Sequence, residues 1–367
     1  MLHSGRLSLE IPKFCRVIVL VTEMGKKAAL ATLLFAAILA AAALAQTNLA
    51  PPFPAPGRLV DVGGWQLHLN CTGQAGRSQP TVILEAGIGD FSVEWSLVQP
   101  DVSKSARVCS YDRAGDGWSD LGPYPRTMHQ LVYELHTLLD EAGVRPPFVV
   151  VGHSYGGWLV RLYAYTYPSE VVGMVLIDAG ASNPWRLQPN GKLVRASDLA
   201  TGKPIPAVQT SNPLKESDVP SAALNQMRAA AQNQGPTANE PPRNKLSADA
   251  QRMRTWSLSR WQHFVAGSNP AESDELVTLA TREKTEHPLG DMPLIVMTRG
   301  LPDETGPDAK TLEEEHKQDQ AAMALLSRNS KQVIATHSGH HIQLDEPELV
   351  IQTIRDVVTS ISSSFSK

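Results

Sequence analysis

The sequence has no large excess of charge of either sign. Its 367 residues include 33 lysines and arginines against 37 aspartates and glutamates, which gives a net charge of −4 at pH 7. Proteins that bind nucleic acid through its phosphates carry a basic surplus on one face, so we expect no nucleic-acid partner. With 42% hydrophobic residues, the chain has the composition of a globular protein with a large core.

Cysteine is scarce, and no pattern typical of a metal site is present. Of three cysteines, Cys15 lies in a segment that we expect to be removed, which leaves Cys71 and Cys109. Histidines gather late in the chain at 337, 340 and 341. No aspartate, glutamate or cysteine accompanies them at ligand spacing, and two adjacent histidines point in different directions. We therefore predict no metal.

The N-terminal 45 residues differ from the rest of the chain. Two lysines are followed by an apolar run from Ala28 to Ala45, which ends in a small-x-small pattern before the polar Gln46. This arrangement is typical of a secretory signal peptide cleaved after Ala45. The run is just long enough to cross a bilayer, but alanine dominates it and disfavours a stable membrane span after cleavage. We expect a periplasmic or secreted protein, whose mature chain has 28 positive and 35 negative side chains.

The remaining chain divides into an interrupted core and an insertion. Residues 46–57 form a proline-rich linker, and residues 58–180 then alternate apolar strands with helices after an initial hairpin at Gly63-Gly64. The alternation returns over 289–367. Near-continuous apolar strands predict a mostly parallel sheet covered by helices on both faces. Residues 181–288 are rich in proline, asparagine, glutamine and alanine, have no convincing strand, and predict a helical cap.

The segment VVVGHSYGGW, residues 149–158, contains the first candidate for chemistry. Gly152-His153-Ser154-Tyr155-Gly156 fits the pattern G-x-S-x-G. In that pattern the serine lies on a strained turn from strand to helix, where larger side chains would collide with the neighbouring elements. Here an apolar strand precedes the turn and a helical stretch follows it. We therefore predict that Ser154 is a nucleophile.

A serine nucleophile needs a base, and the late segment HSGHHIQLDEPE offers it. His340 follows Gly339 and stands before Asp345, at the start of the last helix. His341 is the alternative base. His153 is adjacent to the serine in the turn, and we expect it to point elsewhere.

Four motifs in one order resemble the α/β-hydrolase superfamily, in its serine esterase and lipase-like branch with a helical cap. They are LEAGIGD after the third strand, YDRAGDGWSD after the fourth, GHSYGG after the fifth and GHHIQLDEPE near the end. The resemblance covers about residues 58–362. It implies an α/β fold with a mostly parallel eight-stranded sheet flanked by helices, Ser154 as nucleophile and His340 as base.

The resemblance also implies an oxyanion hole and an acid. In this family two backbone N–H groups hold the oxyanion, and the corresponding groups here belong to Tyr155 and Ile88. Two positions fit the acid that orients the histidine. Asp303 lies after the seventh strand, and Asp178 ends the sixth, where some branches of the family keep the acid. The LEAG and YDRAG motifs favour Asp178, and both positions stay open at this point.

The second and fourth strands are neighbours in this family, so Cys71 and Cys109 are candidates for a disulfide. The activity implied is that of an exported serine hydrolase that cleaves carboxylic esters or related acyl compounds through an acyl-enzyme. Its substrate would be a small or lipid-like acyl compound, and no cofactor is implied. Alternatives are an amide or peptide hydrolase of iminopeptidase type, a cofactor-free haloperoxidase-like enzyme, and an inactive binding protein with the hydrolase fold.

Overall fold

The computed structural model describes residues 51–365, except 75, 77–78, 189 and 235–237. The predicted signal peptide and the first part of the predicted linker, up to residue 50, lie outside the described residues. Within the described ranges, no helix combines the length and the apolar character needed to cross a bilayer.

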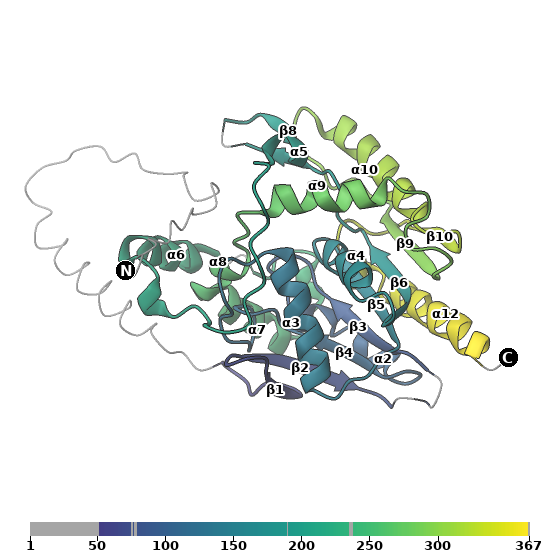
Figure 1. Cartoon of the computed structure of the whole chain (residues 1–367), viewed down its shortest axis with the longest axis horizontal. Coiled ribbons are helices and arrows are strands. Elements are labelled where there is room, and N and C mark those ends of the chain that lie inside the picture. The colour runs from purple at the N-terminus through teal and green to yellow at the C-terminus, as the bar shows by residue number, and fades with distance from the viewer. Residues whose placement is uncertain (1–50, 75, 77–78, 189, 235–237, 366–367) are drawn as a thin grey trace, which may run out of the picture.

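The centre of the molecule is one eight-stranded sheet (Figure 1). Its strands, in chain order, are β1 (Arg58–Asp61), β2 (Gln66–Thr72), β3 (Thr81–Glu85), β4 (Val108–Tyr111), β5 (Phe148–His153), β6 (Val171–Ile177), β9 (Leu294–Arg299) and β10 (Ser330–Ala335). Their order in the sheet is β1-β2-β4-β3-β5-β6-β9-β10. Strand β2 pairs antiparallel with β1 and β4, and the other pairs are parallel. The predicted fold class is confirmed.

Helices bury both faces of this sheet, which explains why its central strands are apolar throughout. In β5, Phe148 and Val150 belong to one core cluster, and Val149 and Val151 belong to the other. Successive side chains of a strand point to opposite faces, so each cluster fills one face. The first face is covered by α3 (Met128–Glu141), α4 (Gly156–Thr166) and the end of α10 (Ala309–Ala324). The second is covered by α2 (Gln99–Val102) and α12 (Pro347–Phe365).

Four more short helices lie in the described part of the chain, two in the core and two in the insertion. They are η2 (Ser92–Trp95) after β3, α11 (Ile342–Asp345) before α12, and the 3₁₀ turns η3 (Glu216–Asp218) and η5 (Arg243–Lys245) in the insertion. Of these, η2 and α11 lie beside the turns that carry the predicted site residues.

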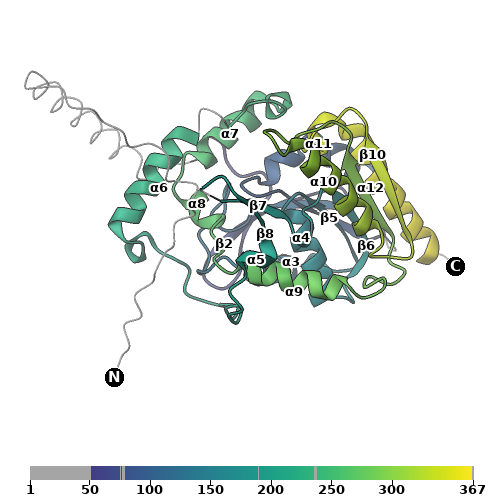
Figure 2. The ribbon, with the colours of Figure 1, turned by 90° about the horizontal axis from the view of Figure 1, so that it is seen from above.

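The chain between β6 and β9, where the sequence predicts a helical cap, contains helices separated by long loops. It holds α5 (Ala196–Leu199), α6 (Ser221–Gln234), α7 (Ala248–Leu258), α8 (Gln262–Ala266) and α9 (Glu272–Glu283). Figure 2 shows α6, α7 and α8 gathered beyond one end of the sheet, with α9 beside α3. Helix α9 contributes Leu276 and Leu279 to the core cluster on that face.

The expectation that the insertion contains no strand is wrong. A small antiparallel pair, β7 (Trp185–Leu187) and β8 (Leu193–Arg195), lies at its start. Asn190-Gly191 lies between the two strands, and asparagine-glycine is a strong signal for a tight hairpin. Each strand is only three residues long. Strands this short in a polar segment show no clear apolar pattern, so the sequence did not indicate them.

A disulfide joins the two cysteines of the folded core. Cys71 and Cys109 are directly opposite each other on antiparallel β2 and β4, and their sulfurs are bonded. Cys109 is completely buried. The strand order that the family resemblance implied therefore brings the two side chains together.

We expect the Cys71→Ala/Cys109→Ala double variant to be less stable than the wild type. The bridge spans a sequence separation of 38 residues. In the chain-entropy model, a disulfide that closes a loop of that length restricts the unfolded chain and so stabilises the fold by about 4 kcal/mol. Denaturant unfolding of the double variant measures the loss. Reduction should destabilise the wild type by a similar amount and leave the double variant unchanged. Two free thiols in the unreduced wild-type protein, found by mass spectrometry, would contradict the bond.

Candidate active site

Ser154 occupies a strained turn between β5 and α4. Its φ of +52° lies in the left-handed region, which costs a non-glycine residue on the order of 1–3 kcal/mol and is found where the surrounding structure enforces it. The carbonyl of Ser154 accepts hydrogen bonds from the N–H groups of Gly157 and Gly180, each at 3.0 Å. From 148 to 160, every residue is buried except Ser154, which is half-buried. The turn therefore presents this one side chain to the surface.

The glycines around Ser154 are required by close approach. A Cβ on Gly152 would lie 2.5 Å from the carbonyl oxygen of Gly156, and one on Gly156 would lie 2.6 Å from that of Glu85. A Cβ on Gly157 would lie 2.3 Å from the Cβ of Ala179. These distances are too short for real contacts. The G-x-S-x-G pattern is thus a steric requirement of packing the turn against β3 and β6.

His340 and Asp178 form a hydrogen-bonded pair, although 162 residues separate them in the sequence. Asp178 follows β6 directly, and His340 lies in the loop between β10 and α11. The Nδ1 of His340 is 2.6 Å from Oδ2 of Asp178. The aspartate side chain is fully buried, and the histidine side chain is 28% exposed. The buried carboxylate of Asp178 can therefore orient the imidazole of His340, which stays accessible to solvent.

Three further groups bind the carboxylate of Asp178. Arg299 donates to it from its backbone N–H and from Nη1, both at 3.1 Å. His316, on α10, places its Nε2 2.9 Å from Oδ1. Burial raises the pKa of Asp178, but the hydrogen bonds from His316 and His340 outweigh burial and hold it well below its usual range. The carboxylate is thus ionised and can only accept hydrogen bonds.

The structure brings only one of the two candidate acids to the histidine. Asp303 is exposed, and its backbone N–H donates to Glu313 of α10. A Cβ on Gly339 would lie 3.7 Å from Oδ1 of Asp303, so this aspartate is close to the loop of His340. The Nδ1 of His340 nevertheless bonds to Asp178.

The two other histidines near the candidate base, His153 and His341, each bring a ring nitrogen within 4.8 Å of the carboxylate of Asp90. His153 directs Nε2 to the backbone carbonyl of His340, at 3.0 Å. Burial and the neighbouring His340 lower the pKa of His153 to about 3. Burial and the neighbouring His153 lower the pKa of His341 to about 2. Groups with such low pKa values are weak bases at neutral pH, so neither competes with His340.

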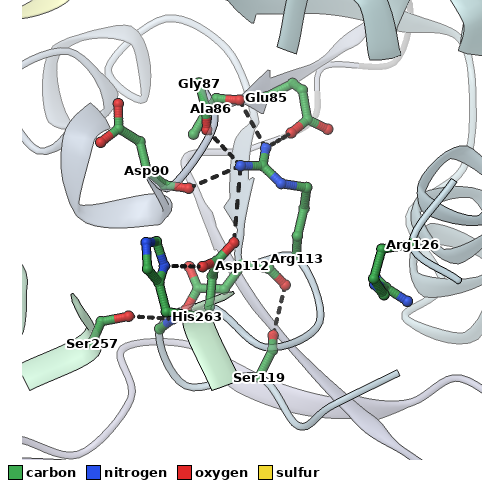
Figure 3. A network of polar contacts seen from close by, with 12 residues as sticks. Glu85, Ala86, Gly87, Asp90, Asp112, Arg113, Ser119, Arg126, Ser257 and His263 are labelled. Atoms are coloured by element: carbon green, nitrogen blue, oxygen red, sulfur yellow. Dashed lines mark hydrogen bonds and ion pairs between the residues drawn. The ribbon is translucent and has the colours of Figure 1, made fainter. Parts of the chain in front are cut away.

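Arg113 fixes the loop after β3, which contains Ile88; Figure 3 shows its contacts with Glu85, Ala86, Gly87 and Asp90. Its guanidinium is buried and donates to the carboxylate of Glu85 at 2.5 Å and to the carbonyl of Ala86 at 2.8 Å. It also donates to the carbonyls of Gly87 and Asp90. Arg113 therefore holds one carbonyl before Ile88 and one after it. Ile88 itself is 51% exposed. Tyr155, next to Ser154, is the N-cap residue of α4.

The loop after β4 contacts the inserted helices through polar groups. Asp116 lies 2.9 Å from Nδ1 of His263 on α8, and the N–H of Gly117 donates to Ser257 on α7 at 3.0 Å (Figure 3). Arg254 of α7 is buried and pairs with Asp90 and Glu94 of the core. These contacts seat the insertion on the loops that surround the candidate site.

Among the residues that the structure describes, one cluster of possible metal ligands includes the neighbours of Ser154 and His340. Asp90, His153 and His341 bring ligand atoms within 4.8 Å of one another. Asp90 is already paired with the guanidinium groups of Arg243 and Arg254. Two adjacent cations oppose the binding of a third, so the donor set fits an ion-pair network better than a metal site.

Three tryptophans gather around a cavity beside the insertion. Trp118, Trp256 and Trp261 line this cavity of about 1170 Å³, which lies between the insertion, the loop after β4 and the segment 51–59. Among the described residues that line it, neither Ser154 nor His340 is found. The three tryptophans therefore line a cavity whose lining does not include the serine or the candidate base.

An eight-stranded sheet of this order, with a serine on the tight turn after β5, defines an α/β-hydrolase architecture. The sequence matches the family described as alpha/beta hydrolase fold over residues 80–347. The chain belongs to this family.

Relatives and solved structures agree with that assignment. An AB hydrolase superfamily protein of Gibberella zeae is 25% identical over 311 residues, covering 76% of this chain and 86% of that protein. An uncharacterised Bacillus subtilis protein, YqjL, is 40% identical over 103 residues, which is 28% of this chain and 41% of YqjL. Two solved structures each match 83% of this chain and 98% of their own, both with a TM-score of 0.56. They are an esterase from Thermogutta terrifontis (19% identical) and the epoxide hydrolase CorEH (16% identical). At these identities the structures show the fold.

Sequence reasoning did not find the groups that surround the acid. Arg299 ends β9, and His316 lies in a helix that reads as polar along its exposed face. Glu313, His316 and Gln320 are spaced by three and four residues, which places them on one side of a helix. This row of polar residues could have indicated a helix side that contacts the acid. A helix side that faces solvent has the same pattern, so the sequence did not distinguish the two.

Proposed function

We propose that this protein is an exported serine hydrolase that cleaves carboxylic esters or related acyl compounds through an acyl-enzyme. Its triad is Ser154, His340 and Asp178. The observation that carries the proposal is the hydrogen bond from His340 to the buried, ionised Asp178. The backbone carbonyl of His340 also contacts Nε2 of His153, the residue before Ser154, and Ser154 is held in the left-handed region on the turn after β5.

The hydrogen bond fixes the tautomer of the base. Since the Asp178 carboxylate is an acceptor, Nδ1 of His340 carries the proton, and Nε2 of the neutral imidazole has a free lone pair. His340 then takes the proton of Ser154 as the serine Oγ attacks the acyl carbon. The same histidine returns the proton to the leaving alcohol, and Asp178 stabilises the imidazolium formed in between.

The backbone N–H groups of Tyr155 and Ile88 are the proposed oxyanion donors. The first begins a helix, whose N-terminus carries a partial positive charge. The second stands between carbonyls that Arg113 holds in place. Donors that are fixed before the reaction need no reorganisation when the negative charge develops. Water activated by His340 then cleaves the acyl-enzyme and frees Ser154.

The nucleophile favours an ester over an epoxide or a haloalkane. It is a serine hydroxyl, whereas epoxide hydrolases and haloalkane dehalogenases of this superfamily use a carboxylate at that position. The exposed Ile88 and a half-buried serine suit a small or lipid-like acyl group.

A substrate panel tests the proposed reaction. The purified protein is assayed with p-nitrophenyl esters of increasing chain length beside aminoacyl anilides. We expect hydrolysis of the esters with a preference for one range of chain lengths. Faster cleavage of the anilides would favour an iminopeptidase-type enzyme instead, and no turnover of either class would favour a binding protein.

Export is part of the proposal. The apolar run before Gln46 has the form of a signal peptide, and the Cys71–Cys109 disulfide suits an oxidising compartment. N-terminal sequencing of the protein from the periplasm or medium should begin at Gln46. A protein that stays in the cytoplasm with the apolar run from Ala28 to Ala45 still attached would contradict export.

A further inference from the structure

The carboxylate of Asp178 binds two histidines, and the proposed triad uses only one of them. Oδ2 lies 2.6 Å from Nδ1 of His340, and Oδ1 lies 2.9 Å from Nε2 of His316. The side chain of Asp178 is fully buried, and that of His316 is 16% exposed. Because the ionised carboxylate can only accept hydrogen bonds, Nε2–H of His316 donates a hydrogen bond to Oδ1, the oxygen that His340 does not use.

Helix α10 is built to hold His316 in that position. Glu313, one turn earlier, accepts from Arg299 at 3.1 Å and from the N–H of Glu304 at 2.7 Å. Gln320, one turn later, is completely buried and donates to the carbonyl of Ala179 at 2.7 Å. The three residues share one side of the helix and contact the chain directly around Asp178. This side of α10 is therefore fixed against the candidate acid over two turns.

Arg299 does not make His316 redundant. Its guanidinium contacts Asp178, but it also pairs with Glu304 and Glu313. Its positive charge is thus shared among three carboxylates. His316 contributes a separate hydrogen bond to Oδ1, which limits rotation of the carboxylate and withdraws part of its negative charge from His340.

Building on the proposed triad, we propose that His316 is a positioning residue of the hydrolytic site. Its hydrogen bond to Asp178 sets the orientation of the acid and the strength with which the acid holds the proton of His340. It touches Asp178 and no reacting atom.

The other charged or titratable groups around this pair come from several elements. They are Arg299 of β9, His340 of the loop after β10, His153 of β5, Arg195 of β8, and Glu313, Glu315 and Asp319 of α10.

A matched pair of uncharged variants tests the proposal. In His316→Gln, the side-chain amide nitrogen reaches the position of Nε2, whereas in His316→Asn it is one bond too short. The dependence of kcat/KM on pH is measured with a p-nitrophenyl ester, and the rate of labelling by a fluorophosphonate is measured over the same range. Lys317→Gln is the charge control, because Lys317 is exposed on the same helix.

We expect His316→Asn to lower kcat/KM by about tenfold or more, the usual effect of losing a hydrogen bond to a charged group. The acidic limb of its profile should move to higher pH by about one pH unit, because a less shielded carboxylate holds the imidazolium of His340 more firmly. His316→Gln should stay close to the wild type in both respects. Lys317→Gln should leave the acidic limb unchanged.

A His316→Asn variant with a lower kcat/KM and an unchanged acidic limb would mean that His316 only packs against its neighbours, and this result would overturn the proposal. Equal shifts in both variants would also overturn it, because the glutamine amide would have failed to replace the imidazole. A wild-type protein that neither cleaves the ester nor reacts with the fluorophosphonate would overturn the proposed function as well, so the two failures are distinguishable.

Discussion

Ser154→Ala and His340→Ala should each lose hydrolytic activity almost completely, and by similar amounts. We expect kcat/KM for the best p-nitrophenyl ester to fall by about 10⁴–10⁶-fold in either variant. The serine provides the bond to the acyl group and the histidine makes the serine reactive, so removing either one stops the same step. The double variant should be no slower than the single variants, because the two residues act as a unit.

Both side chains are partly exposed, and their removal leaves the packing of the turn intact. Thermal unfolding should therefore show variants that fold as well as the wild type. His341→Ala is the comparison for His340→Ala, since His341 is the other candidate base. Its effect on kcat/KM should be far smaller. A His341→Ala variant as inactive as His340→Ala would mean that the base is wrongly assigned.

Asp178→Asn should cost about 10³–10⁴-fold in kcat/KM. An asparagine can present its N–H to Nδ1 of His340, and Nδ1 would then be the acceptor. The proton would move to Nε2, which leaves the wrong nitrogen facing Ser154. The charge that stabilises the imidazolium would be lost at the same time.

Asp303→Asn is the matched control, because it makes the same chemical change in the other candidate acid. Asp303 is exposed, so its replacement should change kcat/KM within about a factor of two. Since Asp178 also binds Arg299 and His316, thermal unfolding must accompany the assay. A folded Asp178→Asn variant with normal activity, or an inactive Asp303→Asn variant, would reverse the assignment.

The fold could be predicted because its signals are local and repeated. Each central strand is buried on both faces, and this appears in the sequence as an uninterrupted apolar run. The turn at Ser154 was equally visible, since its glycines are required by contacts of 2.3–2.6 Å and tolerate no replacement.

The acid could not be decided from the sequence. Asp178 and Asp303 both follow strands at the same edge of the sheet, and sequence position does not report the direction of a side chain. The positive φ of Asp178 directs its carboxylate to His340, and Arg299 and His316 hold it there. Those partners come from a strand end and a polar helix more than 100 residues away. Their convergence depends on tertiary structure.

The short β7–β8 pair and the cavity lined by Trp256 and Trp261 were missed for a related reason. The insertion lacks the repeating pattern of the core, and its polar composition fits many arrangements. Where its helices lie is decided by pairs such as Arg254 with Asp90 and Glu94, each of which joins distant parts of the chain.

The most direct test of the account is to locate the nucleophile. The wild-type protein is treated with a fluorophosphonate, digested and analysed by mass spectrometry beside Ser154→Ala. We predict one adduct per chain in the wild type, on the peptide that contains Ser154, and none in the variant. An adduct on another residue, or a folded wild-type protein that forms no adduct, would contradict a reactive serine at the turn after β5.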